Sequence, residues 1–131
     1  MPGPAAVAAP GLAISNPWIR FIVPGLPAAG YFTLSNTTAT SATLVAASSP
    51  DCGKLMLHES VSGNGRDSMT ELQKFVVPAH QKVAFAPGNY HLMCMAPSAG
   101  VKRGATIPVM LKFADGSTIS ASFPVRGATG R

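Results

Sequence analysis

Residues 54–60 read Lys-Leu-Met-Leu-His-Glu-Ser, an alternation that is typical of a β-strand with one buried face. Successive side chains of a strand point to opposite faces, so Leu55 and Leu57 share one face and His58 lies on the other. If the two leucines point into the core, the imidazole of His58 must point away from it. The segment therefore predicts a strand that packs on one side and presents a possible ligand on the other.

The sequence Tyr-His-Leu-Met-Cys-Met, which ends at Met95, repeats this arrangement. His91, Met93 and Met95 share one face, whereas Leu92 and Cys94 share the other. Cα atoms two residues apart on a strand are separated by roughly 6.5–7 Å, so His91 and Met93 can reach a single ion. If the two segments pair, their histidine-bearing faces come together.

Other short segments have the composition of strands and are separated by turn residues, at residues 11–15, 30–35, 42–47, 73–77, 82–85, 107–113 and 118–125. The chain has 13 Gly and 12 Pro but only 11% charged residues, which favours short strands over helices. We therefore expect an all-β protein, an antiparallel sandwich or small barrel of about eight short strands. We expect Trp18 to pack against the core and Met69 to lie in a polar, irregular segment.

The 131 residues are enough for one domain with a substantial core. We expect a flexible leader at residues 1–10, the domain at residues 11–126 and a flexible tail at residues 127–131. The leader is rich in Ala and Pro and lacks the basic region of a signal peptide, so we interpret it as following a removed signal. No run approaches the ~20 apolar residues that span a bilayer.

The net charge of +5 comes from ten basic residues scattered along the chain, of which only Lys102 and Arg103 are adjacent. Nucleic-acid binding requires a basic stripe with aromatic stacking platforms, which this sequence lacks. A mild attraction to an acidic protein partner is compatible with the charge. The five acidic residues are unpaired, and no nucleophile stands beside a recognisable base, so we do not expect an enzyme.

Two histidines and two methionines, His58, Met69, His91 and Met93, form a donor set of borderline and soft character. Taken singly, a strand histidine is usually a surface or hydrogen-bonded residue, and a methionine usually fills a core. Met69, however, stands among polar residues that need no filler. Thioether sulfur binds hard ions weakly, so this combination favours Cu(I) among the common biological metals.

The spacing of these four residues, His-x10-Met-x21-His-x-Met, resembles the ligand pattern of the periplasmic copper chaperones of the PCu(A)C family. Further segments resemble family signatures in the same order, and they lie at residues 16–20 (Asn-Pro-Trp-Ile-Arg), 28–32 (Ala-Ala-Gly-Tyr-Phe), 57–59 (Leu-His-Glu), 77–79 (Val-Pro-Ala) and 87–93 (Pro-Gly-Asn-Tyr-His-Leu-Met). The resemblance extends over residues 11–125.

This resemblance implies a cupredoxin-like β-sandwich in the periplasm that binds one Cu(I) near its surface through His58, Met69, His91 and Met93. It further implies delivery of that copper to the dinuclear copper centre of cytochrome c oxidase, directly to an oxidase subunit or alongside a thiol-based assembly factor. We expect a monomer that does not span the membrane.

The sequence also departs from the family pattern. Ser60 stands where many members carry a methionine, and Asn16 replaces a histidine. Residues 127–131 lack the His/Met-rich extension that some members use for Cu(II), so we expect no second copper site. Met56 and Met95 are possible auxiliary ligands.

The two cysteines, Cys52 and Cys94, allow three interpretations. In an oxidising periplasm they could form a disulfide that ties the two histidine-bearing strands. Alternatively both are reduced and Cys94 fills the core. Cys94 could also be a copper ligand as in blue copper proteins, but His91 and Met93 precede it here, whereas those sites order their last loop as Cys, His, Met.

Two alternative functions compete with copper transport. One is a metal-free β-sandwich that binds another protein, in which the histidine and methionine positions are incidental. The other is a zinc site, which is less favoured because Zn²⁺ prefers thiolate, imidazole and carboxylate to thioether. His80, next to Pro78 and Ala79, is expected to be a turn residue outside the site.

Overall fold

The computed structural model describes residues 10–63 and 66–130, without the side chains of residues 61–63 and 66–68. Within these ranges the chain forms ten strands and no helix: β1 (Leu12–Arg20), β2 (Ala28–Asn36), β3 (Ala42–Ser48), β4 (Cys52–Gly63), β5 (Arg66–Leu72), β6 (Phe75–Val77), β7 (Lys82–Phe85), β8 (Tyr90–Pro97), β9 (Thr106–Phe113) and β10 (Thr118–Arg126). The all-β prediction is therefore confirmed. Apart from Pro10, the predicted leader lies outside the described residues, as does Arg131 of the predicted tail.

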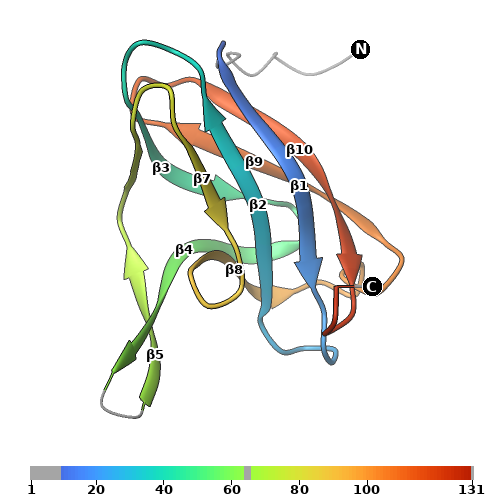
Figure 1. Ribbon diagram of the computed structural model, residues 1–131. Coiled ribbons are helices and arrows are strands. Elements are labelled where there is room, and N and C mark those ends of the chain that lie inside the picture. Colours follow the sequence, from blue (N-terminus) through green and yellow to red (C-terminus); the bar gives the residue numbers. More distant parts are fainter. Residues whose placement is uncertain (1–9, 64–65, 131) are drawn as a thin grey trace, which may run out of the picture.

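Seven strands close into a ring in the order β4-β8-β2-β1-β10-β9-β3, and β3 returns to β4 through the pair Ala47 and Leu55. Neighbours in the ring are antiparallel except β1 and β10, which are parallel. Three strands lie outside the ring: β5 pairs with β4, β6 with β3, and β7 with β2 (Figure 1). The result is a small barrel with attached strands, as the turn spacing indicated.

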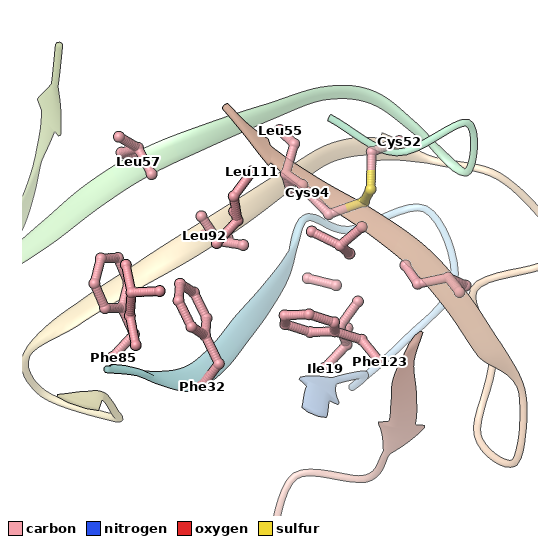
Figure 2. Close-up of a cluster of buried hydrophobic side chains, with 14 of the residues drawn as sticks. Ile19, Phe32, Cys52, Leu55, Leu57, Phe85, Leu92, Cys94, Leu111 and Phe123 are labelled. Carbon is pink, nitrogen blue, oxygen red and sulfur yellow. A yellow bond between two sulfur atoms is a disulfide. The ribbon is translucent and has the colours of Figure 1, made fainter. Parts of the chain in front are cut away.

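The core fills the inside of this ring with aliphatic and aromatic side chains. Strand β9 alternates strictly between exposed and buried residues, and its partner β10 contributes Phe123, which is fully buried. The rings of Phe32 and Phe85 are stacked with centroids 4.5 Å apart, and Phe123 meets Phe32 edge-on (Figure 2). Burial of this apolar surface is the main force that holds the barrel together.

Asn36 is a polar residue in the core at the end of β2, only 1% exposed. Its side-chain amide donates to the carbonyl oxygens of Thr40 (2.9 Å) and Val77 (3.1 Å). Its Oδ1 accepts from the backbone N–H (2.9 Å) and the hydroxyl (2.7 Å) of Thr38. These hydrogen bonds satisfy the buried amide and fasten the β2–β3 loop to β6.

A disulfide joins Cys52 at the start of β4 to Cys94 in β8, with a Cα–Cα distance of 5.3 Å (Figure 2). Both cysteines of the chain are therefore used, which confirms the first of the three interpretations. Cys94 points into the core, away from the face that holds His91 and Met93. The bond ties together the two strands that carry the histidines.

Two local predictions were wrong. Met69 lies in a regular strand, β5, which pairs with β4 over seven residues. β5 is the last strand of the sheet and pairs with β4 alone, and its sequence lacks the apolar alternation that would have marked it. Trp18 does not point into the core: its neighbour Ile19 does, and the Trp18 ring lies on the outer face against Tyr31, with centroids 5.0 Å apart. An irregularity in β1 between Ser15 and Trp18 sets this register.

Candidate metal centre

The two histidines of the β4–β8 ladder face each other. His58 and His91 are direct cross-strand partners, and their ring centroids are 5.5 Å apart with the rings at 75°. Both point away from the core, because Leu57 and Leu92, their neighbours in sequence, are the residues buried inside the barrel. The predicted convergence of the two histidine-bearing strands is confirmed.

Methionines surround this pair on the same outer face. Met93 follows His91 by two residues and lies directly opposite Met56 on β4. Met69 lies opposite Ser60 on β5, so it is the diagonal neighbour of His58 across the β4–β5 ladder. Directly opposite residues have Cβ atoms about 4.5–5.5 Å apart and diagonal neighbours about 7–8 Å, which is within the reach of a methionine side chain. The β4–β8 and β4–β5 registers thus place all four predicted ligands close together on the outer face of the sheet.

The auxiliary candidates differ in their position on this patch. Met56 is two residues from His58 on β4 and directly opposite Met93 on β8, so it adjoins predicted ligands on both strands. Met95 lies opposite Lys54, four residues along β8 from His91. At about 3.3 Å per residue this separates the two Cα atoms by about 13 Å, so Met95 is remote from the histidine pair. His80 lies in a distant turn with φ of 58°, as expected.

Two nitrogens of the histidine pair are buried without any hydrogen-bond partner. These are Nδ1 of His58 and Nε2 of His91. Buried polar atoms almost always have a partner, because leaving one unsatisfied costs about 1–3 kcal/mol. A metal ion held between the rings would satisfy both nitrogens. Within the described residues there is no group of three or more His, Cys, Asp and Glu that could hold a metal. The other donors beside the histidine pair on this face are the methionines and Glu71, an exposed carboxylate directly opposite His58 on β5.

The site differs in exposure from one side to the other. The side chain of His91 is 3% exposed and that of Met93 is 9% exposed, whereas Met69 is 58% exposed. A metal ion bound here would therefore be held by buried groups on the β8 side and reached from solvent on the β5 side. This shallow position permits exchange of the ion with another molecule.

A cation stands next to the site, and the sequence reasoning had not assigned it a role. The Arg20 guanidinium carbon lies 5.2 Å from the Tyr31 ring centroid and 5.8 Å from that of Trp18, a cation–π arrangement. The Tyr31 ring in turn meets that of His91, with centroids 6.4 Å apart. Burial lowers the pKa of His91 below 6.5, and the positive charges of His58 and Arg20 lower it further.

The sequence contained a signal that Arg20 and Trp18 lie on the outer face. Trp18 and Arg20 alternate with Ile19, so an inward Ile19 places both on the outer face. The Trp18–Tyr31 and Ala29–Met93 pairings then align this face with the histidines. The proximity of Arg20 and Trp18 to the histidines also depends on the β1–β2 and β2–β8 registers, which no local sequence pattern gives.

Comparisons with known proteins agree with this architecture. Residues 12–125 match the family model described as "LpqE-like: Putative lipoprotein LpqE-like". The "Putative lipoprotein Lxx21020" of Leifsonia xyli subsp. xyli is 36% identical over 123 residues, which cover 93% of this chain and 74% of that protein.

Two solved structures have the same fold. One is described as the copper-bound PCuAC domain from PmoF2, with a TM-score of 0.76, 19% identity, and coverage of 94% of this chain and 98% of that one. The other is CuI-DR1885 from Deinococcus radiodurans, with a TM-score of 0.72, 25% identity, and coverage of 91% and 80% respectively. These likenesses confirm the cupredoxin-like β-sandwich, and the match over residues 12–125 shows that the chain belongs to the LpqE-like family.

Proposed function

We propose that this protein is a copper chaperone that binds one Cu(I) through His58, Met69, His91 and Met93 and passes it to a copper enzyme. The observation that carries the proposal is the cross-strand histidine pair with two buried, unpartnered nitrogens and methionines on the same face. Imidazole and thioether together suit Cu(I) better than Zn²⁺, Mg²⁺ or Ca²⁺. The descriptions of two similar structures, one copper-bound and one holding Cu(I), support the same conclusion.

The side chains would divide the work of binding and release. His91 and Met93 are buried, so they form the rigid side of the site, and their strand is fixed to β4 by the disulfide. Met69 is exposed, so an incoming donor group from another protein can replace it without opening the core. Both thioethers are neutral, and the lowered pKa of His91 favours its neutral imidazole near pH 7, so these ligands lose no proton when the metal binds.

Met56 is a second candidate for the fourth ligand beside Met69. Met56 is half-buried and directly opposite Met93, whereas Met69 is exposed and diagonal to His58. We keep Met69 in the set because the site then opens toward solvent, which transfer requires. We assign Met56 an auxiliary position next to the ion.

The surroundings in which the protein acts follow from its relatives. The family and its relative in Leifsonia xyli carry the description of lipoproteins, which supports export from the cytoplasm. An exported location also suits a disulfide. We propose that the protein works in the periplasm or an equivalent compartment, and that its recipient is the dinuclear copper centre of cytochrome c oxidase or a thiol-based assembly factor.

The test is a titration of the metal-free protein with Cu(I) against a competing chelator under anaerobic conditions. We expect one equivalent to bind, and His91→Ala to weaken binding at least about 100-fold. His80→Ala is the matched control, because His80 is exposed and distant from the site, and it should bind like the wild type. No competition by the wild type would leave a metal-free interaction module as the better description, and tighter binding of Zn²⁺ than of Cu(I) would favour a zinc site.

A further inference from the structure

The loop between β1 and β2 carries an unusual concentration of exposed apolar side chains. Residues 21–27 read Phe-Ile-Val-Pro-Gly-Leu-Pro. Ile22 is 64% exposed, Val23 44% and Leu26 56%, and these three are among only seven large hydrophobic side chains exposed in the described part of the chain. Scattered single residues of this kind need no explanation, but a cluster on one loop does.

Basic segments adjoin this loop at the same end of the barrel. The backbone N–H of Phe21 donates to the carbonyl of Arg126 (2.8 Å), and that of Gly104 donates to the carbonyl of Val125 (3.1 Å). Residues 21–27 and residues 102–105 are thus each joined to the end of β10, which residues 126–130 follow, and Figure 1 shows the C-terminal end of the chain beside the β1–β2 loop.

Charge is one-sided on these segments. Their exposed charged residues are Lys102, Arg103 and Arg126, and none of the three segments contains an acid. We call the surface formed by Ile22, Val23, Leu26, Lys102, Arg103 and Arg126 the basic apolar end. It combines exposed aliphatic side chains with three exposed basic residues.

We propose that the basic apolar end binds the surface of an anionic lipid bilayer, with Ile22, Val23 and Leu26 inserted at the level of the headgroups. Insertion into the interface is driven by burial of apolar surface and by attraction of Lys and Arg to anionic lipids, and this end supplies both. The inference does not depend on copper binding.

Lipid fits this surface better than a protein partner does. The dominant residues of protein interfaces are enriched in Trp, Tyr and Arg, whereas Leu and Val are under-represented among them; this surface has Arg103 and Arg126 but neither exposed Trp nor exposed Tyr. Here the exposed apolar groups are three aliphatic side chains on a loop that contains Pro24, Gly25 and Pro27, with no aromatic side chain among them. The aromatic Phe21 is half-buried and packs on the core.

The experiment is sedimentation of the metal-free protein with phosphatidylglycerol vesicles and with phosphatidylcholine vesicles. We expect binding to the anionic vesicles that weakens as salt is raised. The triple variant I22S/V23S/L26S should bind at least about tenfold more weakly. The double variant K102Q/R126Q should lose about fivefold for each cation.

A matched control removes three exposed apolar side chains elsewhere. Val45, Val76 and Met110 are 36%, 47% and 38% exposed on β3, β6 and β9, so V45S/V76S/M110S should bind vesicles like the wild type. Thermal unfolding checks that each variant is folded. The proposal is overturned if the wild type binds neither kind of vesicle, if it binds both equally, or if the control loses as much affinity as I22S/V23S/L26S. Association with an acidic protein but with no anionic vesicle would assign the surface to a protein partner instead.

Discussion

His58 on β4 and His91 on β8 are direct cross-strand partners whose ring centroids lie 5.5 Å apart. An ordinary pair of structural histidines would donate to or accept from nearby groups. Here one nitrogen of each ring is buried and has no such partner. Hydrogen bonding within the protein therefore does not satisfy these two nitrogens, which a bound metal ion would do.

Protonation of His91 should destabilise the metal-free protein. Its pKa in the folded protein lies below 6.5 because burial, and then the charges of His58 and Arg20, disfavour the imidazolium. Between that lowered pKa and about 6.5 the unfolded chain binds more protons than the folded one, so stability falls as pH drops through this window. Urea unfolding at pH 7.5 and 5.5 measures the loss, and His91→Leu should show less of it. Equal pH dependence in both proteins would contradict the assignment.

The charge of Arg20 should be visible in the same titration. Arg20→Gln removes one of the three causes of the lowered pKa, so the pKa of His91, followed by NMR, should rise toward 6.5. Lys112→Gln removes an exposed cation on β9 and serves as the control with no expected change. A pKa of His91 that falls in Arg20→Gln would be incompatible with this account.

Met93 should matter far more for Cu(I) than for Zn²⁺. Met93→Leu keeps the volume of the side chain but removes the soft sulfur, so we expect Cu(I) affinity to fall by on the order of 100-fold and Zn²⁺ affinity by about threefold or less. Competition titrations with both ions provide the measurement. Equal weakening for the two ions would argue against a thioether ligand.

Met69 and Met56 can be distinguished in the same way. We expect Met69→Leu to weaken Cu(I) binding by at least about tenfold and Met56→Leu by only a few-fold, because Met69 completes the proposed set. Met110→Leu, on β9, is a neutral control. The reverse order of the two effects would make Met56 the fourth ligand and Met69 the auxiliary one.

Loss of the disulfide should cost much of the stability. Cys52 and Cys94 are separated by 42 residues, and closure of a loop of this length constrains the unfolded chain by about 4 kcal/mol in the loop-entropy model. The double variant C52A/C94A should therefore unfold at a markedly lower denaturant concentration. Reductant should destabilise the wild type by a similar amount and leave C52A/C94A unchanged; a reductant effect on the variant would point to another cause.

Most of the fold could be predicted from local alternation. Period-two spacing grouped Leu55 with Leu57 on one face, and Leu92 with Cys94 on one face, and all four are buried. This works because successive side chains of a strand point to opposite faces, although on β8 the outer residues His91 and Met93 are buried as well. It failed for β5, whose sequence does not alternate between apolar and polar residues and which pairs with β4 alone at the end of the sheet.

The sequence indicated which residues to consider for the candidate site, but it did not give their positions relative to one another. Two long spacings and one short one among four residues indicated which residues to examine, but the pairing of His58 with His91 depends on the register of β4 against β8. Register is set by the packing of the whole barrel and by the turn geometry. The same reason explains why Arg20 and Tyr31 were overlooked: they belong to strands that are distant in sequence and reach His91 only through the sheet.

The place of Met69 outside the closed ring has a consequence for the way an ion could leave. His91 and Met93 lie on β8, which is hydrogen-bonded to β4 on one side and to β2 on the other. Movement of the β8 backbone would therefore open the barrel. In contrast β5 is the last strand of the sheet and pairs with β4 alone. Fraying of this outer strand would withdraw one sulfur and leave the barrel hydrogen bonds intact. The order of the strands therefore favours release of a bound ion on the β5 side, where the proposed ligand Met69 is held by a strand with one neighbour.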